Sequence, residues 1–179
     1  MPPAPPPRNV ALIGYRGTGK TTVGRLLADR LGFDFADADA ELERRLGRTI
    51  AELFASGREP LFRDEEERTV AELTARTGLV LATGGGAVLR EASRAALRRF
   101  GPVVWLRAEP EVLAERLRAD RAARPALTSA GTLAEIAAVL AEREPIYRAV
   151  ADVAIETGGR PVETVVEAIL TALAGRTPR

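Results

Sequence analysis

The feature that most constrains how this chain can fold is a complete phosphate-binding loop near its beginning. Residues 14–21 read G-Y-R-G-T-G-K-T, match the pattern G-x-x-x-x-G-K-S/T, and directly follow an apolar run at residues 10–13. In this pattern the glycines let the backbone turn so that successive N–H groups point inward at the phosphates of a nucleotide. Glycine-rich turns also join strands to helices for packing reasons alone, but here every fixed position is filled and both flanks fit. The loop therefore predicts a nucleoside triphosphate site between a strand and a helix.

Two side chains of this loop predict the chemistry of the site. Lys20 would reach the β- and γ-phosphates as a point charge, and the Thr21 hydroxyl would bind Mg²⁺. The helix that follows adds the positive end of its dipole. The residues expected to contact the nucleotide here are Gly17, Thr18, Gly19, Lys20, Thr21 and Thr22.

The residue types that are missing narrow the chemistry further. The 179 residues include neither histidine nor cysteine, which excludes Ser-His and Cys-His nucleophiles, disulfides and thiolate metal sites. The 26 basic and 25 acidic residues leave a net charge of +1, too small a field to indicate nucleic acid or a membrane surface. No stretch approaches the roughly 20 apolar residues of a membrane span. We therefore expect a cytoplasmic protein without nucleic-acid or membrane partners, whose acid–base chemistry comes from carboxylates, Lys or Tyr.

Apolar runs that alternate with helical patterns predict the fold class. Strands are expected at residues 9–14, 32–36, 79–83, 103–107 and 153–157. Capping boxes at residues 49–52 and 132–135, and Pro161 in a first turn, mark helix starts. Strands that alternate with helices form a parallel sheet covered on both faces, so we expect a three-layer α/β/α fold with five parallel strands. One domain at residues 9–174 would follow a Pro-rich tail at 1–8 and precede a short tail at 175–179.

Two segments break this alternation. Residues 37–78 hold two or three helices, more than one crossover needs, and residues 37–66 are the expected substrate-binding region. Residues 118–131 are rich in arginine and interrupted by Pro125 and Gly131, which is typical of a lid over phosphates or of a solvated surface loop.

Asp37 and Asp39 close the second predicted strand. On an extended backbone alternate side chains face the same side, so both carboxylates would point together. Asp37 could then hold Mg²⁺ through water, and Asp39 could accept a proton from an acceptor hydroxyl. A strand-end turn or a helix N-cap would explain the same pair without any chemistry.

A further charged pair and a glycine run follow. Residues 62–66 are expected to open a helix on which Arg63 and Glu66 share a face, so that Glu66 could fix the guanidinium for a bidentate grip on a carboxylate. From sequence alone a solvated ion pair is the favoured explanation. Residues 83–86 read T-G-G-G after the third strand, which allows either a ligand against the backbone or a plain turn.

The motifs at residues 14–21, 37–39, 62–66 and 83–86 are followed by R-P at 124–125 and E-R-E-P-I-Y at 142–147. This ordered set resembles the shikimate kinase family of nucleoside monophosphate kinase-like P-loop kinases. The resemblance runs from about residue 9 to residue 173. It implies transfer of the γ-phosphoryl group of ATP to the 3-hydroxyl of shikimate, with Mg²⁺, by a monomer in aromatic amino-acid biosynthesis.

The resemblance also implies roles for single residues. Asp39 would bind shikimate hydroxyls and act as the base, Asp37 would orient Mg²⁺ beside Thr21, and Arg63 and Arg143 would clamp the shikimate carboxylate. Further family-like positions are Gly85 and Gly86 (N–H contacts to substrate), Glu66 (support for Arg63), Phe54 and Phe62 (apolar pocket wall) and Arg124 (lid arginine, in catalysis and nucleotide binding).

The adenine side and the lid match the family less closely. Both Arg116 and Arg118 could match the family arginine that stacks on adenine, and we assign that role to Arg116. Residues 158–161, including Arg160, would line the adenine base. The lid reads R-P-A-L where the family more often has R-P-L-L, which affects lid packing and spares the arginine.

Three other functions stay open at this point. A related kinase for gluconate or a nucleotide would keep Lys20 and Thr21 but would not need Asp39, Arg63 and Arg143 together. A catalytically silent relative that serves in binding or regulation would be expected to lose Lys20, Asp39 or Arg63, and all three are present. A nucleotide-dependent switch would leave the carboxylate-binding set unexplained.

Overall fold

The computed structural model describes residues 8–121 and 133–175 of the chain. Most of the predicted lid, including Arg124, lies outside the described residues. So do residue 132, with which the second predicted capping box begins, and nearly all of both tails.

The sheet has five parallel strands, as predicted, and their order is β2-β3-β1-β4-β5. The strands are β1 (Asn9–Ile13), β2 (Asp34–Asp37), β3 (Leu79–Ala82), β4 (Val103–Arg107) and β5 (Val153–Glu156). Every residue of the central strands β1 and β3 is buried, because helices cover both faces of the sheet. One prediction was wrong in detail: the second strand begins at Asp34 and not at residue 32, because Gly32 ends the preceding helix in a left-handed conformation (φ 67°).

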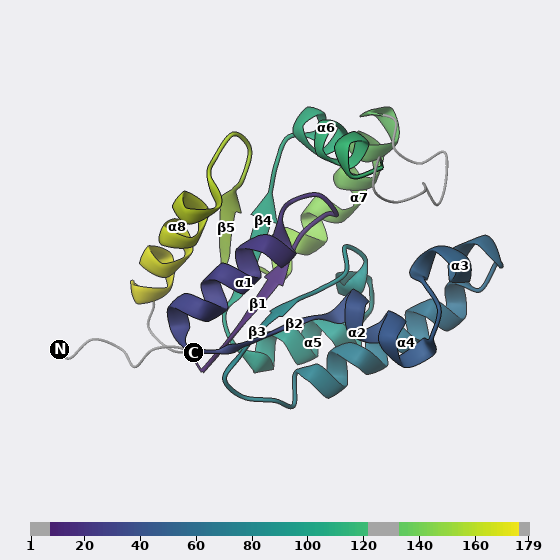
Figure 1. Ribbon diagram of the computed structural model, residues 1–179, viewed down its shortest axis with the longest axis horizontal. Helices are drawn as coiled ribbons and strands as arrows, with labels where there is room; N and C mark the ends of the chain where they lie inside the picture. Colours follow the sequence, from purple (N-terminus) through teal and green to yellow (C-terminus); the bar gives the residue numbers. More distant parts are fainter. Residues whose placement is uncertain (1–7, 122–132, 176–179) are drawn as a thin grey trace.

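Helices cover both faces of this sheet, as Figure 1 shows. Helices α1 (Lys20–Leu31) and α8 (Val162–Ala174) pack on one face, and α4 (Glu59–Leu73), α5 (Glu91–Phe100) and α7 (Leu133–Val150) pack on the other. Helix α6 (Pro110–Arg121) packs on α7 beside the phosphate-binding loop. Pro161 is the N-cap of α8 and not part of its first turn. None of the helices in the described part of the chain is both long and apolar enough to cross a bilayer.

The segment between β2 and β3 forms an arm of three helices, α2 (Ala38–Leu46), α3 (Ile50–Ala55) and α4. The capping box at Thr49 is confirmed, because Thr49 Oγ1 accepts from Glu52 N and Glu52 Oε2 accepts from Thr49 N. Helix α4 begins at Glu59, with a proline in its first turn, and not at residue 62 as predicted. The arm has a small apolar cluster of its own, made by Leu42, Leu53 and Phe62 with Leu46, Ile50 and Phe54 around them.

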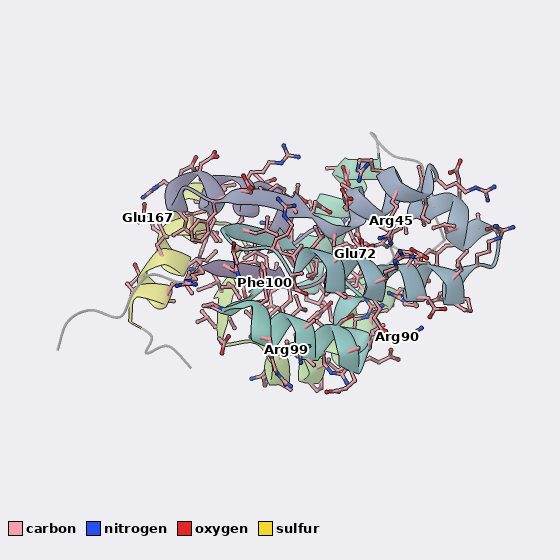
Figure 2. The ribbon with its side chains drawn as sticks, turned by 90° about the horizontal axis from the view of Figure 1, so that it is seen from below. Arg45, Glu72, Arg90, Arg99, Phe100 and Glu167 are labelled. Carbon is pink, nitrogen blue, oxygen red and sulfur yellow. The ribbon has the colours of Figure 1, made fainter. Side chains whose placement is uncertain are left out.

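One arginine fastens α2 to α4 within this arm. Arg45, whose side chain is 23% exposed, donates to Glu65 Oε2 at 2.6 Å, to Thr69 Oγ1 at 2.8 Å and to Glu72 Oε2 at 2.8 Å. Figure 2 shows Arg45 and Glu72 side by side where the two helices meet. Because α2 carries Asp39 and α4 carries Arg63 and Glu66, this contact sets how these predicted acceptor residues face one another.

We expect Arg45→Ala to lower the free energy of unfolding by about 1–3 kcal/mol, because it leaves partly buried acceptors without donors. Urea denaturation measures the change. Arg44→Ala is the matched control: Arg44 is next in sequence, 72% exposed and paired with Glu41 on its own helix, so its loss should not measurably change the midpoint. Equal midpoints for the two variants would contradict a fastening role for Arg45.

Candidate active site

The phosphate-binding loop leaves β1 and runs directly into α1. Gly14, Gly17 and Gly19 have φ angles of 138°, 81° and 89°, which side-chain-bearing residues rarely adopt. A Cβ on Gly14 would also lie 2.2 Å from the Leu106 carbonyl oxygen. The loop is therefore an open turn built from glycine, ahead of a helix N-terminus, as a phosphate site requires.

Lys20 lies over this loop. Its Nζ donates to the carbonyl oxygens of Gly14 at 2.7 Å and Tyr15 at 2.8 Å. Burial lowers the pKa of Lys20 to about 8, against the opposing effect of Asp39 and Asp37. A lysine held in this way is an ammonium donor at neutral pH, beside the backbone that would surround a phosphate.

Asp37 and Thr21 meet at the end of β2. The Thr21 hydroxyl donates to Asp37 Oδ2 at 2.6 Å, while Asp37 Oδ1 accepts from the N–H groups of Asp39 and Ala40. The expectation of an extended backbone through Asp39 was wrong, because Asp37 is the N-cap of α2 and the chain turns helical at Ala38. The N-cap explanation therefore holds for Asp37, and its second oxygen still faces the phosphate-binding loop.

These two oxygen ligands fit a magnesium ion. Mg²⁺ is usually bound by one or two protein oxygens together with substrate phosphates and water. Among the described residues no group of three carboxylates could hold a metal by itself. Thr21 and Asp37 would therefore be the protein ligands of a metal that arrives with a nucleotide.

Asp39 lies in the first turn of α2, against the glycine run that follows β3. A Cβ built on Gly84 would lie 2.5 Å from Asp39 Oδ1 and 2.8 Å from Glu66 Oε1, so the two carboxylates meet above a glycine. Burial, followed by the charges of Asp37 and Glu66, raises the pKa of Asp39 to about 7, and Lys20 opposes the rise. A carboxyl group with this pKa can accept a proton near neutral pH.

Arg63 and Glu66 form a partly buried ion pair on α4. Arg63 Nη1 lies 2.7 Å from Glu66 Oε2, and only 15% of Arg63 and 3% of Glu66 are exposed, so the pair is not the solvated one that sequence alone favours. Burial raises the pKa of Glu66, and Arg63 counters part of that rise. A Cβ on Gly86 would lie 2.2 Å from Arg63 Nη1. Glu66 thus holds the guanidinium against the glycine run.

The aromatic residues of the arm complete this side of the site. The rings of Phe54 and Phe62 are 5.0 Å apart, and the Arg63 guanidinium lies 5.0 Å from the Phe62 ring and 6.0 Å from the Phe54 ring. The two rings give Arg63 an apolar support that limits its freedom and strengthens its charge interactions.

Arg143 reaches the same glycine run from α7. Its Nη1 would lie 3.6 Å from a Cβ on Gly85, and that Cβ would also be 3.4 Å from the backbone N of Arg16 in the phosphate-binding loop. Gly85 therefore lies between the two halves of the site. Sequence reasoning assigned no role to Tyr147, although it lies four residues after Arg143 and so shares its helix face.

The nucleotide side is held by Arg116. Its guanidinium donates to Gly17 O at 3.1 Å, Thr157 Oγ1 at 3.1 Å and Thr157 O at 2.8 Å. Arg118 bonds instead to Ala114 O on its own helix. Arg160 is exposed in the turn before α8, near Thr157. The structure thus brings Arg116 to the phosphate-binding loop, while its contact with adenine stays a prediction.

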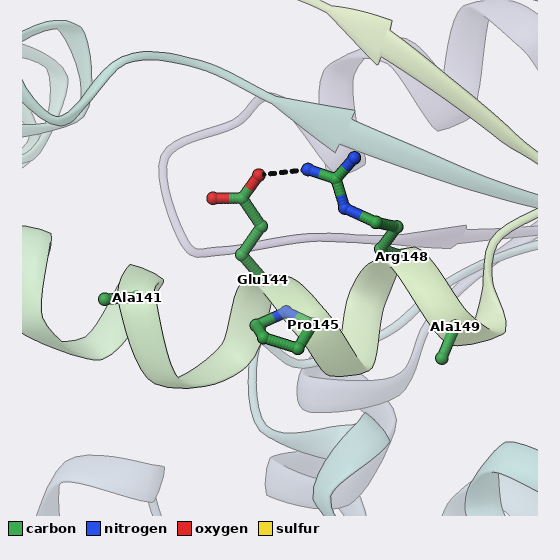
Figure 3. A pocket seen from close by; sticks show the side chains of 5 residues that line it. All are labelled: Ala141, Glu144, Pro145, Arg148 and Ala149. Atoms are coloured by element: carbon green, nitrogen blue, oxygen red, sulfur yellow. Dashed lines mark hydrogen bonds and ion pairs between the residues drawn. The ribbon is translucent and has the colours of Figure 1, made fainter.

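A separate open hollow lies on the outer face of α7, lined by Ala141, Glu144, Pro145, Arg148 and Ala149. Figure 3 shows Glu144 bridged to Arg148 there, at 2.7 Å. None of its lining residues belongs to the predicted site.

A glycine phosphate loop on a parallel sheet, a carboxylate pair beside it and a helical arm with arginines define the class of P-loop small-molecule kinases. Within that class the chain belongs to the shikimate kinase family, whose model matches residues 16–174. It is 48% identical to "Shikimate kinase" of Pseudomonas syringae pv. syringae (strain B728a), over 96% of this chain and 99% of that protein.

Two solved structures agree with this assignment. The shikimate kinase from Acinetobacter baumannii in complex with shikimate matches with a TM-score of 0.85 and 40% identity, covering 92% of this chain and 91% of the other. The shikimate kinase from Bacteroides thetaiotaomicron matches with a TM-score of 0.84 and 30% identity, covering 93% of this chain and 98% of the other.

We expect Asp39→Asn to stabilise the fold by about 1–3 kcal/mol at pH 8 while it removes activity. Burial raises the pKa of Asp39 from 3.8 to about 7, so the folded chain holds a proton that the unfolded chain has released. The wild type therefore loses stability as the pH rises from about 4 to about 7, and Asn avoids that loss. Urea denaturation of both proteins at pH 8 and at pH 5 measures the difference in stability. A gain in the variant that did not shrink at pH 5 would contradict the raised pKa of Asp39.

Proposed function

We propose that this chain transfers the γ-phosphoryl group of ATP to the 3-hydroxyl of shikimate, giving shikimate 3-phosphate and ADP. It would do so as a cytoplasmic monomer that serves aromatic amino-acid biosynthesis. The observation that carries the proposal is the meeting of Asp39, Arg63 and Arg143 around one glycine run, next to the phosphate-binding loop. A carboxylate and two guanidinium groups suit an acceptor that has several hydroxyls and one carboxylate.

On the donor side, Lys20 and the N–H groups of the loop would hold the ATP phosphates. Residues 17–19, Thr21 and Thr22 complete that set, and Mg²⁺ bound by Thr21 and Asp37 would offset phosphate charge. Arg116 and Arg160 would lie at the adenine end. Arg124 would close over the phosphates from the lid, a role that rests on sequence because this residue lies outside the described part of the chain.

On the acceptor side, Arg63 and Arg143 would bind the shikimate carboxylate, and Gly85 and Gly86 would present N–H groups. Glu66 would keep Arg63 oriented, and Phe54 and Phe62 would form the apolar wall. The proton of the 3-hydroxyl would pass to Asp39 as the hydroxyl oxygen bonds to the γ-phosphorus of ATP. The bond between that phosphorus and the bridging oxygen breaks, and the oxygen leaves with ADP. The pKa of Asp39, about 7, suits that transfer near neutral pH.

The deciding experiment is a coupled ADP-release assay with ATP and Mg²⁺, run with shikimate, gluconate, nucleoside monophosphates or no acceptor. We expect ADP release that depends on shikimate, with the phosphoester product identified by mass spectrometry. Release of ADP with another acceptor would support a kinase whose substrate is not shikimate. Binding of ATP without any turnover would favour a catalytically silent relative.

Lys20→Ala should lower turnover in the same assay by more than about 100-fold, because it removes the positive charge that faces the transferring phosphoryl group.

We expect Arg63→Ala to weaken shikimate binding by roughly 100-fold while ATP binding changes less than twofold, because a buried, charged partner of the substrate is lost. Calorimetry with each ligand separates the two effects. Arg68→Ala is the matched control, since Arg68 lies on the same helix, is 66% exposed and pairs with Glu72. Equal weakening of both ligands in a folded Arg63→Ala protein would remove Arg63 from the acceptor site.

A further inference from the structure

Tyr147 makes the closest contact to the glycine run from outside the predicted site. Its hydroxyl donates to the Gly85 carbonyl oxygen at 2.5 Å, and its side chain is fully buried. Its ring stacks on Trp105 of β4, with the centroids 5.8 Å apart and the planes 27° apart. The phenol thus packs between α7 and the sheet, and its hydroxyl gives the loop a buried hydrogen-bond donor.

The glycine run has few means of its own to hold one conformation. Residues 84–86 are three consecutive glycines, so no side chain of their own holds the peptide planes in one orientation. Burial raises the pKa of Tyr147 to about 12, so its hydroxyl keeps its proton throughout the physiological range. The hydroxyl can therefore donate to Gly85 throughout that range.

The carbonyl of Gly85 and the N–H of Gly86 belong to one peptide unit. This unit is planar and trans, as are all peptide bonds among the described residues, so its C=O and N–H point in opposite directions. With the carbonyl directed at Tyr147, the N–H of Gly86 must point away from the α7 layer. Gly86 itself lies against the Arg63 guanidinium, where the acceptor carboxylate is expected.

We propose that Tyr147 is a positioning residue for the acceptor: its hydroxyl fixes the Gly85–Gly86 peptide so that the Gly86 N–H faces the bound substrate. This role rests on the proposed function, because it assumes that the glycine run contacts shikimate. Tyr147 does not touch the substrate. It acts through the loop, and its hydroxyl also interacts with the Arg143 side chain. Arg143, one helical turn earlier on α7, contacts the same loop and would reach the carboxylate directly.

The test is Tyr147→Phe, which keeps the ring and its stacking on Trp105 and removes only the hydroxyl. We expect the KM for shikimate to rise about tenfold, the size of effect that one hydrogen bond can produce. The KM for ATP and the kcat should each stay within about twofold. Calorimetry with shikimate alone should show the same tenfold loss of affinity, and a cooperative thermal transition confirms the fold.

Trp105→Phe is the matched control, because it disturbs the same ring stack but leaves the Tyr147 hydroxyl and the Gly85 carbonyl in place. It should lower the melting temperature without changing the KM for shikimate. An unchanged KM in Tyr147→Phe overturns the proposal. So does an equal loss for both substrates, or the same KM change in Trp105→Phe, since each would mean a purely structural role. Failure of the wild type to phosphorylate shikimate would instead overturn the proposed function.

Discussion

The parallel pairing of β2, β3 and β1 is the constraint on which the site depends. Ala82, at the end of β3, pairs with Leu12 on one side and with Asp37 on the other, so the three strands end at one level. The phosphate-binding loop, the start of α2 and the glycine run therefore leave the sheet along one edge. Residues that are far apart in sequence therefore meet there, as the bond from Thr21 to Asp37 shows.

Three carboxylates lie close together at that edge, which is energetically unfavourable. Asp37, Asp39 and Glu66 lie close together, and burial with mutual repulsion raises the pKa of Asp39 to about 7. Lys20 offsets part of this repulsion, and Arg63 neutralises Glu66. The fold tolerates the cluster because the strands and the arm are held elsewhere, by apolar packing and by Arg45. Such a conflict between stability and local charge is typical of sites that are built for chemistry.

The sequence predicted the parts of the molecule that local patterns determine. The strands, the phosphate-binding loop and the Thr49 capping box follow from neighbouring residues and were found where expected, apart from the start of the second strand. Asp39 was placed on an extended backbone because strand and N-cap signals overlap at Asp37, and the cap prevailed. The burial of the Arg63–Glu66 pair could not be predicted, since it depends on how α4 packs against the glycine run. Tyr147 belongs to the E-R-E-P-I-Y motif, but its role could not be predicted, because a buried tyrosine resembles any core residue until its partner is known.

The arm's own apolar cluster has a consequence for how such proteins diversify. Leu42, Leu53 and Phe62 pack with one another and form a cluster separate from the two that cover the sheet. The helices that we propose bind the acceptor thus form a unit with its own apolar packing, joined to the sheet at β2 and β3. Residues of these helices that face the acceptor can be substituted without changing the phosphate-binding loop. The same site for phosphoryl transfer can therefore serve different small-molecule acceptors.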